Sequence, residues 1–192
     1  MRKIILIFLI LGLVFATAFA AANVKNDTKT KIILLISEQN IEGPQRAWWA
    51  SEVDLSTTEA KLATKLIEAG FEVMEPSNLT KVIRQDRAFR MLDLSESKSV
   101  KLGNLARATY VVLGKAIASS GGNVPQSNMR SCFANVTAKL IRVKDGKVVA
   151  YLEAAGNSAH MDVITGGREA LTHAGEELAN KVINALNKEG GK

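Results

Sequence analysis

Two histidines, His160 and His173, are the only candidates in the sequence for a histidine general base. Hydrolases of the Ser-His-Asp kind need such a base beside a nucleophile, with a carboxylate that orients the imidazole. His160 stands in the short segment His160-Met161-Asp162, and the chain contains no Gly-x-Ser-x-Gly motif that would mark a nucleophile. We therefore expect no catalytic residues, and a small hydrolase that uses His160 or His173 is the least favoured function.

His173 has two acidic neighbours, Glu176 and Glu177, three and four residues further along the chain. On a helix this spacing places an imidazole and a carboxylate on one face, where they could bind a metal ion. The same spacing is more common on a solvated helix face. We expect no metal ion and no cofactor.

Cys132 is the single cysteine, which excludes an intrachain disulfide and any multi-cysteine metal site. It opens an expected strand, and we interpret it as an inert small side chain rather than a nucleophile. Gly166-Gly167 precede the last expected helix, whose first backbone amides could hold an anion. Because no Lys-Ser or Lys-Thr pair follows, we interpret the two glycines as a turn between a strand and a helix.

The amino terminus has the pattern of a signal peptide. Met1-Arg2-Lys3 is positively charged, residues 4–15 are almost all Ile, Leu, Phe and Val, and an alanine-rich stretch follows. This predicts a signal peptide over residues 1–20, cleaved after Ala20 or Ala22. We expect periplasmic localisation, with no transmembrane segment after cleavage. No lipid anchor is expected either, because the cleavage region has no cysteine.

The remaining sequence predicts an α/β fold, on the border of α+β, in one domain over residues 31–188. Residues 21–30 are expected to be a flexible leader and 189–192 a tail. Hydrophobic patterning and capping signals indicate a mixed sheet with helices packed on it, in the order β-α-β-α-α-β-β-β-α. Strands are expected at 31–37, 71–74, 109–118, 132–143 and 147–158. A helix is expected from Ser56, which forms a capping box with Glu59, to Gly70, a natural left-handed helix terminus. Further helices are expected after Pro76, at 95–108 and at 167–188.

The last two strands predict a hairpin across Lys144-Asp145-Gly146. A three-residue loop, with Gly146 in the left-handed conformation, pairs Val143 with Lys147 and brings apolar residues together on one face. A two-residue loop would instead mix apolar and polar side chains on both faces. Because burial of one face selects the register, we expect the three-residue loop. The apolar pairs are then Val136–Ala154, Ala138–Leu152 and Leu140–Ala150.

Positive charge is concentrated in one segment. The chain has 25 basic and 19 acidic residues, and removing residues 1–20 leaves 23 and 19. Residues 81–107 hold the whole excess of four, with seven basic and three acidic side chains. This favours a surface for an acidic partner. The residues expected to bind this partner are Lys81, Arg84, Arg87 and Arg90. Export and the scarcity of aromatic residues make nucleic acid an unexpected partner.

Trp48 and Trp49 lie in a long expected loop, residues 38–54, that follows a strand. Adjacent side chains on an extended segment point in opposite directions, so one indole could pack inward while the other is offered to a partner. Alternatively, both indoles pack on the core of the domain. A pocket near Trp48 would instead indicate a protein that binds a small ligand.

Three stretches together resemble a known family: EAKLATKLIEAGFEVMEPSNLTKVI (59–83), LGNLARATYVVLGKAIAS (102–119) and ANVTAKLIRVKDGKVVAYLEAAG (134–156). With a closing Ala/Leu helix they look like the exported curli-secretion-lipoprotein-like group. That group is similar in fold to the TolB amino-terminal domain, the middle domain of flagellar assembly protein T and an outer-membrane activator of penicillin-binding proteins. The resemblance is nearest in kind to the flagellar assembly domain, and it supplies no catalytic residues.

The resemblance implies a soluble periplasmic adaptor. The curli secretion protein builds a pore with an acylated cysteine and long membrane hairpins, but residues 119–131 of this chain are too short and polar for that role. We therefore expect a non-enzymatic module that binds an envelope protein, acidic on the charge argument. Its expected setting is the assembly of the cell envelope or of an appendage, flagellar or secretory.

Overall fold

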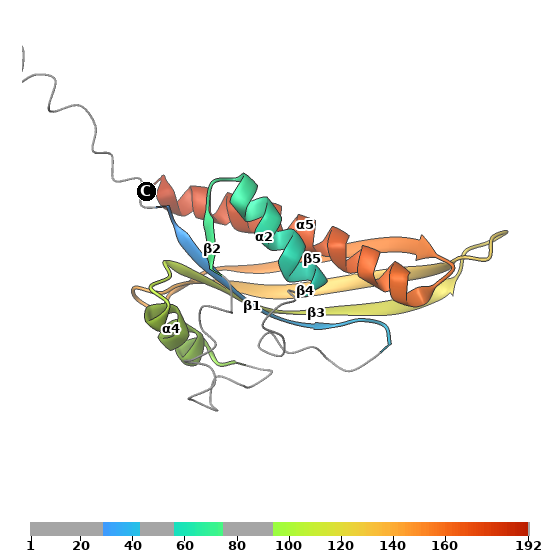
Figure 1. The fold of residues 1–192 in the computed structure, drawn as a ribbon, viewed down its shortest axis with the longest axis horizontal. Coiled ribbons are helices and arrows are strands. Elements are labelled where there is room, and N and C mark those ends of the chain that lie inside the picture. The colour runs from blue at the N-terminus through green and yellow to red at the C-terminus, as the bar shows by residue number, and fades with distance from the viewer. Residues whose placement is uncertain (1–28, 43–55, 75–93, 192) are drawn as a thin grey trace, which may run out of the picture.

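The computed structural model describes residues 29–42, 56–74 and 94–191, and Figure 1 shows their arrangement. The strands are β1 (Lys31–Gln39), β2 (Glu72–Met74), β3 (Tyr110–Asn123), β4 (Arg130–Arg142) and β5 (Val148–His160). The helices are α2 (Thr57–Glu68), α4 (Glu96–Leu105) and α5 (Val163–Gly190). The strands form one five-stranded sheet in the order β2-β1-β3-β4-β5. Strand β1 runs parallel to β2 and β3, and the other pairs are antiparallel, which confirms the predicted α/β fold with a mixed sheet.

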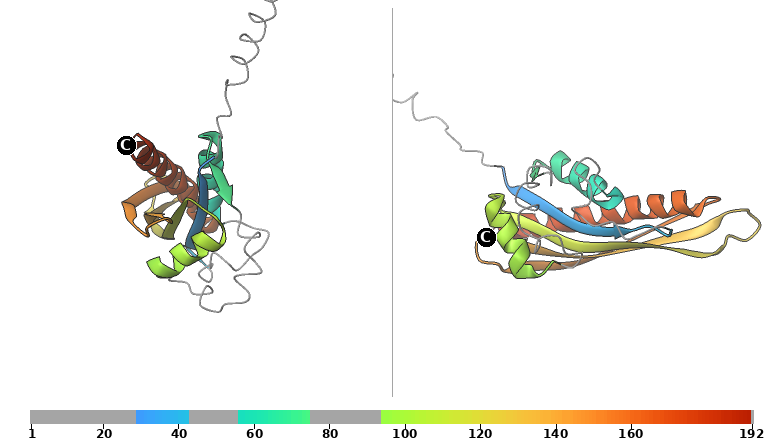
Figure 2. Two further views of the ribbon diagram at one scale, coloured as in Figure 1. Left: turned by 90° about the vertical axis from the view of Figure 1, so that its left-hand side faces the viewer. Right: turned by 60° about the horizontal axis from the view of Figure 1, so that its bottom comes forward.

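Helices α2 and α5 cover one face of the sheet, and α4 lies at one end of the opposite face (Figure 2). Alternate residues of a strand point to opposite faces, so each long strand contributes one set of side chains to the core beneath α2 and α5. This larger core includes Leu34, Val112, Val136, Leu140 and Leu178. A smaller core packs beneath α4, around Ile33, Leu102, Val111 and Val143. The two clusters explain why β1 is apolar on both faces.

The local signals around α2 are confirmed. Ser56 accepts a hydrogen bond from the Glu59 amide at 3.2 Å, and the Glu59 carboxylate accepts one from the Ser56 amide at 3.5 Å, as in a capping box. The chain leaves the helix through Gly70, whose φ is +90°, a conformation that glycine adopts without strain. The expected helix after Pro76 lies outside the described residues.

The predicted pairing of the β4–β5 hairpin is correct, but the predicted loop is wrong. Val136 faces Ala154 and Leu140 faces Ala150, yet Arg142, not Val143, is the residue that bonds Lys147, across a four-residue loop. A bulge between Leu140 and the loop restores the register. Val143 leaves the hairpin because its amide donates to the Thr109 carbonyl at 3.0 Å and its side chain packs beneath α4.

The predicted turn at Gly166-Gly167 is also wrong. Helix α5 begins at Val163 after the N-cap Asp162, so both glycines lie inside its first turns and are buried. A Cβ at Gly166 would lie 2.6 Å from Cys132 Sγ, and one at Gly167 would overlap Asn40 Oδ1. The glycines therefore allow α5 to approach the sheet closely, which explains them without a bound anion.

We expect Gly146→Val to destabilise the protein by about 1–2 kcal/mol, because Gly146 has a φ of +69° that a β-branched residue adopts only with strain. Space is not the cause, since a Cβ there would meet no atom nearer than 3.8 Å. Lys147→Val, at the neighbouring exposed position, should change stability much less. Urea unfolding of the two variants measures the difference, and equal midpoints would contradict the assigned loop.

Candidate functional site

Both histidines are engaged by the backbone in the described part of the chain. His173 Nδ1 lies 2.7 Å from the Asn157 carbonyl oxygen, and His160 Nδ1 accepts a hydrogen bond from the Asp162 amide at 3.0 Å. The imidazole of His173 therefore contacts the backbone at the edge of β5, and that of His160 contacts the backbone just before α5. These contacts give no support to a hydrolase that uses either histidine.

The two carboxylates near His173 are directed to other partners. Glu176 forms ion pairs with Lys61 and Lys65 of α2, at 3.6 and 3.5 Å. Glu177 binds Lys181 and the Ala155 amide, and these contacts lower its pKa. Among residues 29–42, 56–74 and 94–191 there is no group of three His, Cys, Asp or Glu side chains that could hold a metal ion.

Cys132 is fully buried in the larger core, on the β4 face that meets α5. Its Sγ lies 3.9 Å from the Val163 carbonyl oxygen at the start of α5. Solvent has no access to the thiol, so its contribution is packing, as the sequence indicated.

All six residues predicted to bind a partner lie outside the described residues: Trp48, Trp49, Lys81, Arg84, Arg87 and Arg90. The described part of the basic segment is residues 94–107, which form α4 and the turn after it. This part carries Lys98, Lys101 and Arg107 against Glu96.

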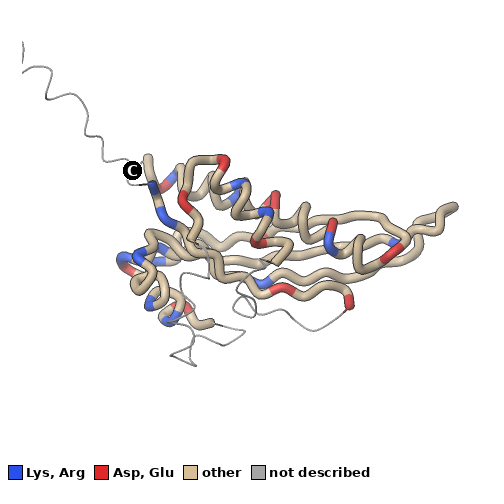
Figure 3. The backbone as a smooth tube through the Cα atoms, in the orientation of Figure 1, with Lys and Arg blue, Asp and Glu red and all other residues tan. Residues whose placement is uncertain are grey.

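The β4–β5 loop adds further positive charge beside α4. A hollow of about 530 Å³ separates the two, lined by Val100 and Asn104 of α4 and by Val143 to Gly146 of the loop. We call α4, its C-terminal turn and this loop the basic end, and Figure 3 shows lysine and arginine gathered there. Its basic residues are Lys98, Lys101, Arg107, Arg142, Lys144 and Lys147, and its acidic residues are Glu96 and Asp145.

Ion pairing leaves part of this charge exposed. Arg142 binds Asp145 at 3.2 Å and Glu189 at 3.1 Å, so the acidic residue of the loop is already satisfied. The pKa of Asp145 is lowered, first by the Lys147 amide and also by Arg142. Arg107, Lys144 and Lys147 are exposed and have no acidic partner within the described ranges. Sequence reasoning missed the contribution of this loop to the surface, because about forty residues separate the loop from α4.

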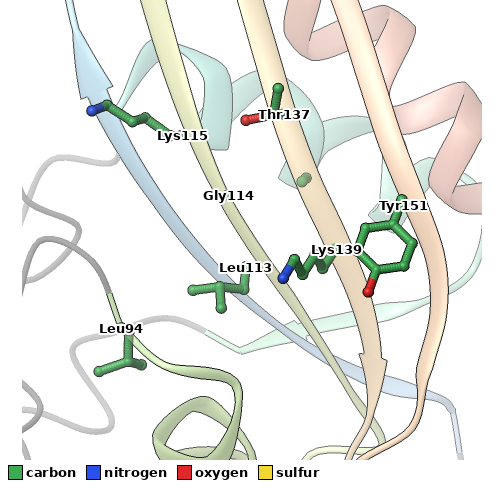
Figure 4. A pocket seen from close by; sticks show the side chains of 8 residues that line it. Leu94, Leu113, Gly114, Lys115, Thr137, Lys139 and Tyr151 are labelled. Carbon is green, nitrogen blue, oxygen red and sulfur yellow. The ribbon is translucent and has the colours of Figure 1, made fainter.

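The open face of the sheet continues the basic end. Lys139 binds Glu96 at 2.5 Å and lies 5.3 Å from the centre of the Tyr151 ring. Beside this pair is a hollow of about 370 Å³, whose lining includes Leu94, Leu113, Lys115 and Thr137. Figure 4 shows Lys139 extending across the sheet toward Leu113. The surface thus combines cationic and apolar groups around an exposed tyrosine.

No family model matches the chain, and no curated protein matches it significantly. Similar solved structures include lipoprotein GNA1162 from Neisseria meningitidis, with 15% identity, a TM-score of 0.43 and coverage of 85% of this chain and 99% of that chain. Hypothetical protein CT253 from Chlamydia trachomatis has 10% identity, a TM-score of 0.49 and coverage of 83% and 96%. A minor lipoprotein from Acinetobacter baumannii has 13% identity, a TM-score of 0.42 and coverage of 83% and 94%. Two of these three proteins are bacterial lipoproteins, and the relationship to the flagellar assembly domain stays a prediction.

Proposed function

We propose that the chain is an exported, non-enzymatic module of the bacterial cell envelope that binds an acidic protein partner through its basic end. The observation that carries the proposal is the meeting of α4 and the β4–β5 loop, which exposes Arg107, Lys144 and Lys147 without acidic partners in the described structure. The signal-like amino terminus supports export. No helix of the described ranges is long and apolar enough to cross a membrane.

A protein fits this surface better than a simple polyanion does. Leu105 of α4 is 52% exposed and Tyr151 of β5 is 73% exposed, so apolar and aromatic groups lie among the cations. Tyrosine is enriched in the core of protein interfaces, where it combines apolar contact area with a hydrogen-bonding group. Complementary charge around such a core accelerates association and selects the partner.

The sequence offers further residues for this surface and a setting for its role. Trp48 and Trp49 would add aromatic contacts, and Lys81, Arg84, Arg87 and Arg90 would extend the positive charge. The resemblance to exported adaptors favours a role in the assembly of the envelope or of a flagellar or secretory appendage. A small-ligand-binding protein is the alternative, and the hollow beside Lys139 is the observation that favours it.

The double variant Lys144→Glu with Lys147→Glu should lose its partner at low salt. A photo-crosslinking amino acid at Asn104, on the basic end, is expected to capture one acidic envelope protein in cells of the source organism. In a binding assay with that purified protein, the double variant should bind at least tenfold more weakly at 50 mM salt. The difference should shrink at 1 M salt, because the screening length falls to about 3 Å.

The matched control is Arg130→Glu with Arg168→Glu, which makes the same change in net charge at the opposite end of the molecule. This control should bind normally. If both double variants lose binding equally, net charge alone explains the effect and the basic end is not the binding surface. Equal capture from Asn104 and from Asn123, at the far tip, would also contradict the proposal.

A further inference from the structure

Strand β5 is the last strand of the sheet, and no described strand pairs with its outer edge. In an antiparallel pair, alternate residues direct both backbone polar groups away from the neighbouring strand. For β5 these include Glu153, Ala155 and Asn157. The outer edge of a strand of 13 residues is a template for pairing with another chain, unless other groups bind its backbone.

Three side chains of α5 occupy this edge. Lys181 Nζ donates to the Glu153 carbonyl oxygen at 2.6 Å, and Glu177 Oε2 accepts from the Ala155 amide at 2.8 Å. His173 Nδ1 lies 2.7 Å from the Asn157 carbonyl oxygen, as a donor. We call His173, Glu177 and Lys181 the edge row. They are four residues apart, so they form one line along the helix, and they contact alternate residues of the strand.

Two side chains of the edge row also form an ion pair with each other. Glu177 Oε1 lies 2.6 Å from Lys181 Nζ, so one carboxylate binds both the strand and its neighbour in the row. Gly156 is the reason that α5 lies so close to β5, since a Cβ there would overlap the Ala170 carbonyl oxygen. The side chains therefore reach the backbone groups that an added strand would use.

We propose that the edge row closes a latent strand-pairing interface, whose partner is the β5 edge of a second copy of this chain. Without the row, the outward groups of Glu153, Ala155 and Asn157 would need new partners. A second β5 strand, related by a twofold axis, supplies the same groups in antiparallel order. This inference does not depend on the proposed function, because it rests on the contacts between α5 and the backbone of β5 and uses no charged residue of the basic end.

The outward backbone groups select the register of this pairing, because only a twofold axis at Ala155 pairs Glu153, Ala155 and Asn157 with the same three residues of the other copy. A twofold axis at Ala155 places Glu153 opposite Asn157 of the other copy, and Tyr151 opposite Ala159. No like charges then face each other. An axis at Glu153 would bring two carboxylates together, which is unfavourable for directly opposed strand residues.

The test replaces the whole edge row with alanine: His173→Ala, Glu177→Ala and Lys181→Ala. Light scattering after size-exclusion chromatography should give twice the wild-type mass at concentrations where the wild type does not associate further. Hydrogen exchange at the Ala155 amide should be slow in the doubled form and should become faster on dilution. Adding Ala155→Glu should restore the wild-type mass, because two carboxylates would then meet at the axis.

The matched control removes another set of partly exposed ion pairs on the same helix layer, with Lys61→Ala, Lys65→Ala and Glu176→Ala. Its mass should equal that of the wild type. If the control also doubles in mass, loss of surface charge rather than the open edge causes association. A folded edge-row variant that keeps the wild-type mass overturns the proposal.

A milder variant covers the case in which the triple variant does not fold. Glu177→Ala opens the Ala155 amide and removes the centre of the row. A synthetic peptide of residues 148–160 should bind this variant at least tenfold more tightly than it binds the wild type. Equal binding by both proteins would overturn the proposal.

Discussion

Replacing Gly156 by alanine should destabilise the protein by about 3 kcal/mol or more, the largest effect that we expect from a single added carbon atom. Gly156 lies in β5 beneath α5. A Cβ there would overlap the Ala170 carbonyl oxygen, lie 2.5 Å from the Ala174 amide nitrogen and lie 3.0 Å from His173 Cβ. Two of these atoms belong to the helix backbone, which cannot move aside as a flexible side chain can. Helix α5 must shift away from the sheet, and the packing of the larger core is then lost.

Urea unfolding monitored by circular dichroism measures this change. The matched control is Gly122→Ala in β3, where a Cβ would meet no atom within 4 Å and the backbone needs no glycine conformation. This substitution should change stability by less than about 0.5 kcal/mol. If Gly156→Ala unfolds at the same urea concentration as Gly122→Ala, the close contact between β5 and α5 is not present in solution.

The second large effect concerns Glu59, the capping residue of α2. Its side chain is 2% exposed, and burial raises its pKa from 4.5 to about 7. The hydrogen bonds that Glu59 Oε1 accepts from the Ile36 amide at 2.9 Å and that Oε2 accepts from Ser56 oppose this shift. Glu38 lies nearby and raises the pKa further by charge repulsion, while its own carboxylate binds the amides of Thr57 and Thr58.

A raised carboxyl pKa means that the folded protein binds a proton more tightly than the unfolded chain does. The stability that protonated Glu59 contributes to the folded protein is therefore fully present below pH 4.5. It is lost as the pH rises from 4.5 through 7. A shift of this size corresponds to about 3 kcal/mol. The contribution of Glu59 to stability should thus fall by about that amount between pH 4 and pH 8.

The variant Glu59→Gln isolates this contribution, since glutamine keeps the shape and can still accept from Ile36. Relative to the wild type, its free energy of unfolding should rise by about 3 kcal/mol from pH 4 to pH 8. Glu176→Gln is the control, because ion pairs with Lys61 and Lys65 lower the pKa of Glu176 and give the opposite trend. Parallel pH profiles for the wild type and Glu59→Gln would show that Glu59 ionises normally in the folded protein.

The features that the sequence determined depend on residues close together in the chain. The capping box of Ser56 and Glu59, and the left-handed conformations of Gly70 and Gly146, need only neighbours within a few residues. The pairing of β4 with β5 also follows from local information, because a short loop and one apolar face together fix the register. The signal peptide and the basic segment are patterns of composition and need no fold.

Tertiary structure decided the features that join distant segments. The sequence placed Val143 in the hairpin, but a hydrogen bond to Thr109 and the packing of α4 draw it into the smaller core. Gly166 and Gly167 by themselves indicate a turn, because no residue near them in the sequence shows that Cys132 and Asn40 lie against them in the fold. In both cases a contact with another element outweighs the local preference.

The same reason limits what the sequence could say about the surface. It identified the basic segment of 81–107, but the loop with Lys144 and Lys147 joins it only because β3 and β4 bring that loop beside α4. It identified His173 and Glu177 as neighbours on a helix, but their role at the β5 edge depends on where α5 crosses the sheet. Local sequence fixes the dihedral angles and the alternation of side chains, whereas the meeting of two segments depends on the closure of the whole sheet and its helices.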